Sequence, residues 1–359
     1  MRNNYWPISG RDAIRRVLRS CVVCFRIKPV STKQLMGDLP AVRVTQARAF
    51  LHTGLDYAGP FSIKISRNKT SKCYLAIFVC LATKAVHFEL VLDLKATSFL
   101  NAMKRFIARR GKCATLYSDN GTTFVGANNQ LLELKECLAQ QAVQNQIKNY
   151  CTEQFIDWKF IPPYSPHMGG IWEAAVKSAK THMRKIIGTT ALSFEELYTV
   201  LTQIEAVLNS RPLTQLANDP TDLQPLTPGH FLIGEPMNAI PEPDISEVPM
   251  NRLTRYQLLE QMRQYFWSRW SKEYVIQLQQ RYKWKYSEFI NICPGAMVLL
   301  RNENTSSMVW PLGRIVELHP GPDGITRVVT VRTSQGLCKR AITKICLLPI
   351  DDKNAVIAE

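Results

Sequence analysis

The sequence lacks the signatures of several common protein classes. No run of 18 apolar residues occurs, which excludes a transmembrane helix, and the first residues lack the apolar core of a signal peptide. No Ser-His-Asp order, Walker loop or dinucleotide-binding loop is present, and there is no internal repeat or low-complexity tract. Hydrophobic residues make up 46% and charged residues 21% of the 359 residues, a balance typical of a globular protein with two or three domains.

The cysteines do not form the pattern of a disulfide framework. Most of the ten lie at scattered strand-like or helical positions, which favours reduced thiols in an intracellular protein. Cys21 and Cys24 are the exception, because two thiols at this spacing can reach one Zn²⁺ ion. A tetrahedral site needs four ligands, and the first histidine of the chain is His52. The pair is therefore either half of a zinc site or two plain thiols, and Zn²⁺ binds only if the missing ligands come from outside this chain.

Acidic residues are scarce relative to basic ones. Lys and Arg total 45 against 29 Asp and Glu, a formal net charge of +16. Residues 1–50 hold 10 basic and 2 acidic side chains, and residues 251–350 hold 15 and 6, whereas residues 51–250 hold 19 and 18. Two basic flanks around a near-neutral centre indicate an anionic partner, with nucleic acid first and an acidic membrane surface second. The simpler interpretation is a basic surface that aids solubility.

The hydrophobic pattern of the first 210 residues predicts an α/β core with a mixed sheet. A short basic helix over 11–27 and an irregular linker over 29–50 precede it. We then expect strands at 53–65, with a turn at Gly59-Pro60, and at 73–81, 85–92, 114–118 and 157–161, and helices over 97–110, 128–150, 171–187 and 193–209.

The remaining residues predict a second, smaller module. Residues 211–250 contain eight of the twenty prolines and are expected to form an extended connector. A long aromatic-rich helix over 253–284 follows. Short β runs at 297–301, 313–318, 326–332 and 338–342, with a tight turn at 321–324, predict a small β-barrel-like domain.

Three acidic residues stand out by their positions in this pattern. Asp56 lies within an apolar strand, Asp119 follows the fourth strand, and Glu173 lies in the first turn of a helix. Taken singly, they can be an edge residue, a turn former and a residue favoured by the helix dipole. Together they can converge at one edge of a sheet, where divalent cations relieve their repulsion. Mg²⁺ prefers such oxygen ligands, and two ions about 4 Å apart can clamp a phosphodiester.

The residues around these acids resemble the three motifs of retroelement integrases, and more narrowly those of BEL/Pao-type LTR retrotransposons. The flanks match as well: residues 5–29 resemble the end of the family's His₂Cys₂ zinc-binding domain, and residues from about 252 to 350 resemble the domain that follows the catalytic core. The motifs are Gly-Leu-Asp-Tyr-Ala-Gly-Pro at 54–60, Tyr-Ser-Asp-Asn-Gly-Thr-Thr-Phe at 117–124 and Ser-Pro-His-Met-Gly-Gly-Ile-Trp-Glu at 165–173.

The resemblance implies a DDE recombinase with an RNase H-like core. Asp56, Asp119 and Glu173 are then the catalytic acids, which hold Mg²⁺ or Mn²⁺ for 3′ processing and strand transfer. Lys177, Lys180 and Asn120 are expected to contact nucleic acid. The implied partners are the DNA ends of the retroelement, chromosomal target DNA and further copies of the same chain. The implied location is the nucleus, with a cytoplasmic particle stage and no membrane association.

The resemblance also implies a division into parts. Residues 1–30 correspond to a remnant of the zinc-binding domain, so the chain is expected to be N-terminally truncated. Residues 31–50 form a linker, 51–210 the catalytic core, 211–250 the proline-rich connector, and 251–350 the helix with the small β domain. Asp119 and Glu173 are further apart than the roughly 35 residues common in the family. That spacing points towards Glu153, but Glu173 opens a helix behind a loop, and an inserted helix over 128–150 explains the excess.

Two alternatives remain open at the level of the sequence. The chain can be an integrase-like DNA-binding protein without catalytic activity, either as a degenerate copy or as one adopted by the host, which the missing zinc ligands favour. It can also be an RNase H-like nuclease that acts on hybrids, which shares the metal chemistry but leaves the basic flanks unexplained.

Overall fold

The computed structural model of the chain describes residues 10–21, 39–118, 155–160, 170–188, 190–217, 221–278, 292–301 and 305–349, with single positions at 145, 149, 151, 153 and 219; for residues 170–178 it describes the backbone alone. The chain divides into two compact units, 1–41 and 42–359. In the first unit, α1 (Gly10–Ser20) forms the N-terminal half of the helix expected over 11–27.

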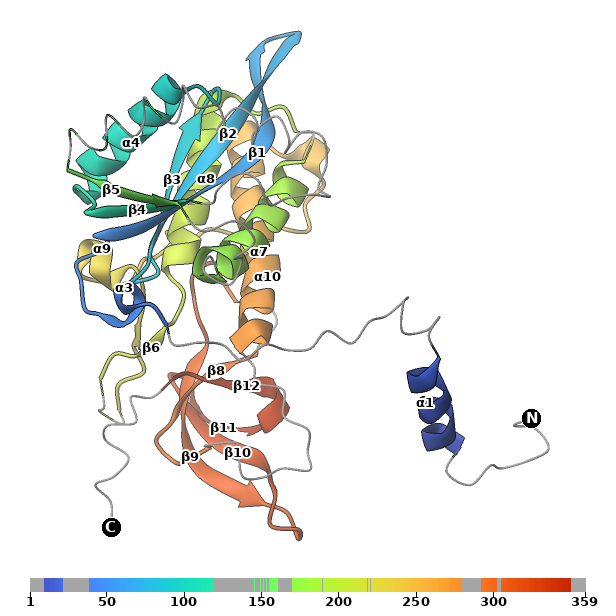
Figure 1. Cartoon of the computed structure of the whole chain (residues 1–359). Coiled ribbons are helices and arrows are strands. Elements are labelled where there is room, and N and C mark those ends of the chain that lie inside the picture. The colour runs from blue at the N-terminus through green and yellow to red at the C-terminus, as the bar shows by residue number, and fades with distance from the viewer. Residues whose placement is uncertain are drawn as a thin grey trace. The chain divides into compact units, whose positions relative to one another are not determined.

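A five-stranded mixed sheet is the centre of the second unit (Figure 1). Its strands are β1 (His52–Ser66), β2 (Lys69–Cys80), β3 (Val86–Val91), β4 (Thr115–Ser118) and β5 (Asp157–Phe160). The order is β3-β2-β1-β4-β5, in which β1, β2 and β3 are antiparallel neighbours and β4 and β5 run parallel to β1. This is the RNase H-like arrangement, so the predicted fold class is confirmed.

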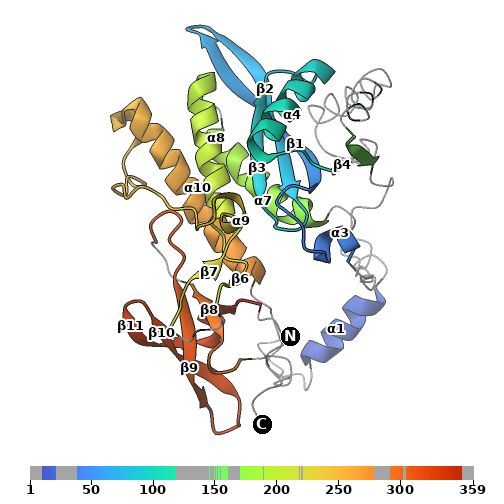
Figure 2. The same ribbon diagram turned by 90° about the vertical axis from the view of Figure 1, so that its left-hand side faces the viewer.

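Helices cover both faces of this sheet (Figure 2). On one face, α4 (Ala96–Arg110) packs Phe99, Met103 and Phe106 onto the sheet. On the other face, α7 (Gly170–Ile187) and α8 (Phe194–Asn209) share a second apolar cluster with β1, β2 and β3. Ser193 begins α8 as expected, in a capping box with Glu196.

One local prediction in the core is wrong. A turn was expected at Gly59-Pro60, but β1 continues through both residues to Ser66. The pairing of β1 with β2 shifts between Ala58 and Phe61, as in a β-bulge. Such an irregularity accommodates a proline that has no N–H for the ladder, so the pair interrupts the register without ending the strand. The helix expected over 128–150 lies almost entirely outside the described residues.

The connector is less extended than predicted. It contains a two-stranded ladder of β6 (Thr214–Gln215) and β7 (Pro225–Leu226), the short helix α9 (His230–Ile233) and a 3₁₀ turn, η2 (Met250–Arg252). A further short helix, α3 (Ala41–Val44), precedes the sheet.

The C-terminal residues form a second five-stranded sheet, in the order β11-β10-β9-β8-β12. The predicted tight turn is confirmed, since the Gly324 N–H donates to the Gly321 carbonyl at 2.9 Å. Sequence patterns missed the last strand, which has only three residues. The elements are β8 (Met297–Leu300), β9 (Leu312–Pro320), β10 (Thr326–Thr333), β11 (Gly336–Ala341), η4 (Ile342–Lys344) and β12 (Ile345–Leu347).

The aromatic helix α10 (Arg255–Leu278) packs against α7 and α8, as a further layer over that face of the core. Its residues Phe266, Trp267 and Trp270 are buried in the same apolar cluster as the two core helices. Trp310, which precedes β9, contacts this aromatic row and donates to the Ser210 hydroxyl at 3.2 Å. The helix is therefore part of the hydrophobic core that supports α7.

Candidate active site

Asp56 lies on β1 at the point where the parallel strand β4 ends. Leu55 pairs with Ser118, the last residue of β4, so Asp56 is the first residue of β1 beyond this ladder. Leu55 and Tyr57 on either side are buried, whereas the Asp56 side chain is 30% exposed. Ligand sites of open α/β sheets form at the carboxyl ends of parallel strands. The strand thus places one carboxylate, partly open to solvent, at such an edge.

Lys180 of α7 reaches this carboxylate. Its Nζ lies 2.5 Å from Asp56 Oδ2, and the Tyr57 N–H donates to Asp56 Oδ1 at 2.7 Å. The lysine side chain is 19% exposed. A partly buried carboxylate is stabilised by a positive charge or a hydrogen-bond donor at each oxygen, and here an ammonium group supplies the charge. The sequence placed Lys180 on the Glu173 face of a helix, but spacing did not reveal its contact with Asp56.

The position of α7 over β1 is fixed by contacts near its C-terminal end. Met183 and Ile187 are buried in the apolar cluster, and Arg184 Nη2 donates to the Gly59 carbonyl at 3.0 Å. Glu173 lies in the first turn of α7 and Lys177 in the second. Residues 173, 177 and 180 share one face of a regular helix, because seven residues make about two turns. The backbone therefore places position 173 on the same helical face as the lysine that contacts Asp56.

The other predicted site residues are not described at the level of side chains. Asp119 and Asn120 follow β4 directly and lie outside the described residues, as does Cys24, whereas Cys21 is partly buried at the end of α1. For Glu173 and Lys177 the backbone alone is described. Within the described part of the chain, no three His, Cys, Asp or Glu residues form a group that could hold a metal ion. The structure thus brings Asp56 and Lys180 together and leaves the other assignments as predictions.

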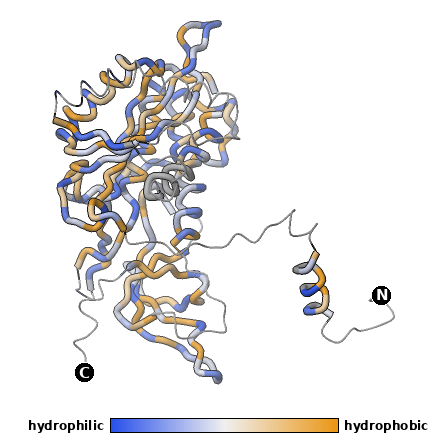
Figure 3. The backbone as a smooth tube through the Cα atoms, viewed as in Figure 1, coloured by the Kyte–Doolittle hydropathy of each residue, from blue (hydrophilic) through white to orange (hydrophobic). Residues whose placement is uncertain are grey.

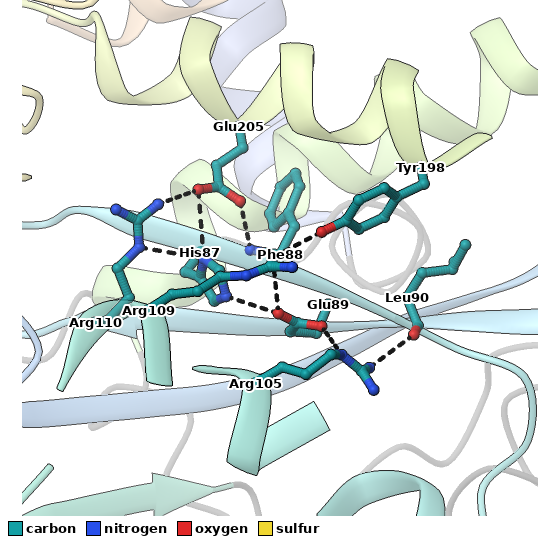
Figure 4. Close-up of polar contacts among 9 residues, drawn as sticks. All are labelled: His87, Phe88, Glu89, Leu90, Arg105, Arg109, Arg110, Tyr198 and Glu205. Carbon is teal, nitrogen blue, oxygen red and sulfur yellow. Dashed lines mark hydrogen bonds and ion pairs between the residues drawn. The ribbon is translucent and has the colours of Figure 1, made fainter. Parts of the chain in front are cut away.

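A second polar cluster, which sequence reasoning missed, lies along β3, an edge strand of the sheet (Figure 4). We call it the β3 cluster. The side chain of Glu89 is 1% exposed and accepts from Arg105 Nε at 2.6 Å and from Arg109 Nη1 at 3.2 Å. Glu205 of α8 accepts from Arg110 Nη2 at 2.7 Å. Its members are His87, Glu89, Arg105, Arg109, Arg110, Tyr198 and Glu205.

His87 links the two acids of this cluster. Its Nε2 lies 3.1 Å from Glu89 Oε1, and its Nδ1 lies 3.4 Å from Glu205 Oε1 and 3.3 Å from Arg110 Nε. Burial alone lowers the pKa of His87, but the hydrogen bonds with Glu205 and Glu89 outweigh it and raise the pKa overall. Burial likewise raises the pKa of Glu89, whereas His87 and Arg105 lower it below its ordinary value.

Two of these side chains, Glu205 and Arg105, close the free edge of β3 together with Asn209. Asn209 accepts from the Val86 N–H and donates to the Val86 carbonyl, each at 2.8 Å, as a paired strand would. Glu205 accepts from the Phe88 N–H at 2.7 Å, and Arg105 donates to the Leu90 carbonyl at 3.2 Å. The cluster thus protects an edge strand from pairing with another chain. A signal for it was present in the sequence, because His87 and Glu89 interrupt an otherwise apolar strand on one face.

Comparison with known proteins gives limited matches. Residues 254–348, which span α10 and the C-terminal sheet, match DUF5641, a family of unknown function. No curated protein matches the chain. Within the described residues, no helix combines the length and the apolar character that a membrane crossing requires.

Three solved structures of retroviral proteins are similar to the chain. The simian T-cell lymphotropic virus intasome in complex with a PP2A regulatory subunit contains a chain 14% identical, with a TM-score of 0.37, over 96% of this chain and 92% of that one. The HTLV-2 integrase catalytic core domain in complex with magnesium is 16% identical, with a TM-score of 0.31, over 47% and 91%. The BIV integrase catalytic core domain is 16% identical, with a TM-score of 0.34, over 52% and 95%. All three TM-scores are below 0.5.

Proposed function

We propose that the chain is an integrase of the BEL/Pao type that carries out Mg²⁺-dependent 3′ processing and strand transfer of retroelement DNA. The observation that carries this proposal is the ion pair between Asp56 and Lys180 where β4 ends. It supports the proposal because Asp56, the acid of the first motif, meets a helix whose first turn contains the end of the third motif. Asp119, the acid of the second motif, follows directly after the strand that pairs with β1.

Asp56, Asp119 and Glu173 are the residues that would hold the metal. Three carboxylates form a set of hard oxygen donors that suits Mg²⁺ or Mn²⁺. The ion pair between Asp56 and Lys180 supports the proposal, because the Asp56 carboxylate is available to a positive charge at this edge. Bound ions would supply the charge that stabilises the entering and leaving oxygens of a phosphodiester. The donor chemistry of the three residues suits such ions.

The remaining work of the chain is to position DNA. Phosphoryl transfer of this kind needs charge neutralisation and orientation rather than a covalent enzyme intermediate. Lys180 has a role both without and with DNA. Without DNA it neutralises Asp56, and when DNA binds it can turn to a phosphate. Lys177, one turn earlier on the same helical face, is assigned to the adjacent phosphate of the retroelement end.

The direct test is strand transfer by the full chain with an oligonucleotide that matches the retroelement end. We expect products with Mg²⁺ or Mn²⁺ and a loss of at least about 100-fold in Asp56→Asn and in Asp119→Asn, because each removes charge stabilisation at the reacting phosphate. Retention of DNA binding with no product from the wild-type chain would favour the catalytically inactive, DNA-binding alternative. Cleavage of RNA–DNA hybrids without strand transfer would favour the nuclease.

A matched pair of variants tests whether Glu173 or Glu153 is the third catalytic acid. Glu173→Gln and Glu153→Gln make the same change at the two candidates that the spacing leaves open. Glu153 is exposed, so we expect Glu153→Gln to retain activity and Glu173→Gln to lose it to the same extent as Asp56→Asn. The reverse result would move the third acid to Glu153 and would leave the rest of the proposal intact.

A further inference from the structure

The hairpin of β1 and β2 extends beyond the rest of the sheet. β4 pairs only with residues 52–55 of β1, and β3 pairs only with residues 74–79 of β2. Beyond these ladders the two strands pair with each other, in the register Ser62↔Lys72, Ile63↔Ser71 and Lys64↔Thr70, and Ile63 adds one isolated bridge to Leu192. Figures 1 and 2 both show this end of the hairpin projecting past the sheet. We call residues 62–72 the basic ribbon.

One face of the ribbon is anchored to the core. Phe61, Ile63 and Cys73 are buried in the apolar cluster beneath α7 and α8. Ile63 forms a bridge with Leu192, and the Lys64 N–H donates to the Leu192 carbonyl at 2.8 Å. The base of the ribbon is therefore held by the segment between α7 and α8, so a ligand on the ribbon meets a fixed platform rather than a loose loop.

The opposite face carries hydrogen-bond donors. Ser62 and Lys64 flank the buried Ile63, and their cross-strand partners Lys72 and Thr70 are exposed like them. Figure 3 shows hydrophilic residues toward the tip of this projecting end. The cross-strand pairs Ser62↔Lys72 and Lys64↔Thr70 each place one hydroxyl beside one ammonium group. Lysine, arginine, serine, threonine and asparagine side chains are those that contact phosphate oxygens. Arg67, Asn68 and Lys69 add three more such side chains at the tip of the ribbon.

The ribbon contains no acid of its own. Residues 57–88 contain no Asp or Glu at all. Among the described residues, Lys64, Arg67 and Lys69 form no ion pair. Asp93, on a neighbouring segment, lines a hollow of about 520 Å³ together with Thr70 and Lys72. The β3 cluster, in contrast, pairs each of its arginines with a carboxylate.

We propose that the basic ribbon binds the phosphate backbone of double-stranded DNA, as a second contact separate from the candidate active site. Lys64, Arg67 and Lys69 supply the charge, and Ser62 and Thr70 supply neutral donors. The proposal rests on the proposed function only in naming DNA as the nucleic acid. Because the contacts are to phosphates, the binding is independent of base sequence.

The position of the ribbon fixes where along the DNA it acts. Lys64 is eight residues and Arg67 eleven residues beyond Asp56 along β1 and its turn. At roughly 3.3 Å per residue these positions lie roughly 26 to 36 Å from Asp56. One turn of B-form DNA is about 34 Å long. The ribbon therefore contacts the backbone about one helical turn away from a phosphate held at Asp56.

Lysines on exposed strands also have a structural use, because they discourage edge-to-edge aggregation. The two uses make different predictions. If the cations serve only solubility, removing them causes aggregation and leaves DNA affinity unchanged. If they bind DNA, removing them weakens binding and reduces its dependence on salt, since each phosphate contact contributes about 0.9 to the slope of log K against log salt concentration.

The test compares two double variants of the full chain, Arg67→Gln/Lys69→Gln in the ribbon and Lys104→Gln/Lys112→Gln on and just after α4. All four residues are exposed and lie outside the two basic flanks of the sequence, and each variant removes two positive charges. Binding to a random-sequence 40-base-pair duplex is measured by fluorescence anisotropy between 50 and 200 mM salt. We expect the ribbon variant to lower the salt slope by about 1.8, from about 0.9 per phosphate contact, and the α4 variant to leave it unchanged.

Equal slopes in the two variants, or an unchanged slope with visible aggregation of the ribbon variant, would overturn the proposal. Duplex length provides a second measurement. Affinity is expected to drop in the wild-type chain when the DNA beyond the retroelement end is shorter than about one turn, and this drop is expected to vanish in the ribbon variant. Neither measurement involves catalysis. A ribbon that fails to bind DNA is therefore distinguishable from a chain that fails to transfer strands.

Discussion

The two charged sites of the core differ in how completely their acids are neutralised. In the β3 cluster, two carboxylates meet three arginines and a histidine, and Glu89 is almost fully buried. At the β1 site, Asp56 meets Lys180 alone among the described residues, and both side chains are partly exposed. Asp119 directly follows β4 in the sequence, and Glu173 lies in the first turn of α7, the helix that carries Lys180.

The difference is in how many charge partners each described acid has. Every acid of the β3 cluster already has its charge partners, and these contacts close the edge of β3. Asp56 has one described cationic partner and its side chain is 30% exposed. If Asp119 and Glu173 lie at the β1 site as proposed, their carboxylates exceed the charge of that one lysine, and a cation is expected to bind there. Variants that remove the basic partners at each site in turn test this difference.

The largest effect is expected at the β3 cluster. Arg105→Met/Arg109→Met leaves the Glu89 carboxylate, which is 1% exposed, with His87 as its remaining partner. A buried charge that loses its partner typically costs about 3 kcal/mol or more, so we expect a loss of this order in the free energy of unfolding, measured by urea denaturation. Adding Glu89→Gln should restore part of the loss, because the unpaired charge is gone. A double variant as stable as the wild type would mean that the cluster does not hold the fold.

A smaller effect is expected from pH. The pKa of His87 is raised in the folded chain, so protonated His87 favours the folded state. This contribution is fully present below about pH 6.5, the ordinary pKa of histidine, and is lost as the pH rises through the raised pKa. We expect the free energy of unfolding to fall as the pH rises above about 6.5, and His87→Asn to flatten this part of the profile. An equally steep profile in the variant would assign the dependence to other groups.

The smallest effect on stability is expected at the β1 site. Lys180→Met removes an ion pair whose partners are 19% and 30% exposed, and such pairs contribute about 0 to 1 kcal/mol. The same variant should bind Mn²⁺ more tightly, because Lys180 no longer competes for the Asp56 carboxylate. Electron paramagnetic resonance of free Mn²⁺ measures this change directly. Weaker Mn²⁺ binding in the variant would show that the lysine supports the metal rather than competing with it.

Much of the fold followed from local pattern. Alternation and continuous apolar runs located β1, β2 and β3, and helical periodicity located α4, α7 and α8, because these elements bury one regular face or both. The errors have physical causes. Gly59-Pro60 has the composition of a turn, yet the bulge absorbs it within β1. β12 is too short to show any period.

The sites were predictable to different degrees. Asp56 stood out as an acid in an apolar strand, and Lys180 as a cation at helical spacing from Glu173. Their contact depends on how α7 lies across β1, which the Arg184 bond to the Gly59 carbonyl and buried Met183 determine. The β3 cluster joins strand β3 to the helices α4 and α8. His87 on the strand and Glu205 on α8 are 118 residues apart in the sequence. No local pattern contains that information.

The most direct test of the account is Mn²⁺ binding by the full chain, compared between Asp56→Asn and Glu205→Gln. Each variant replaces one carboxylate by an amide, one at the β1 site and one in the β3 cluster. We predict that Asp56→Asn weakens Mn²⁺ binding at least about tenfold, or about 1.4 kcal/mol, and that Glu205→Gln binds Mn²⁺ as the wild type does. Wild-type affinity in Asp56→Asn, or an equal loss in both variants, would contradict the assignment of the metal site to the end of β4.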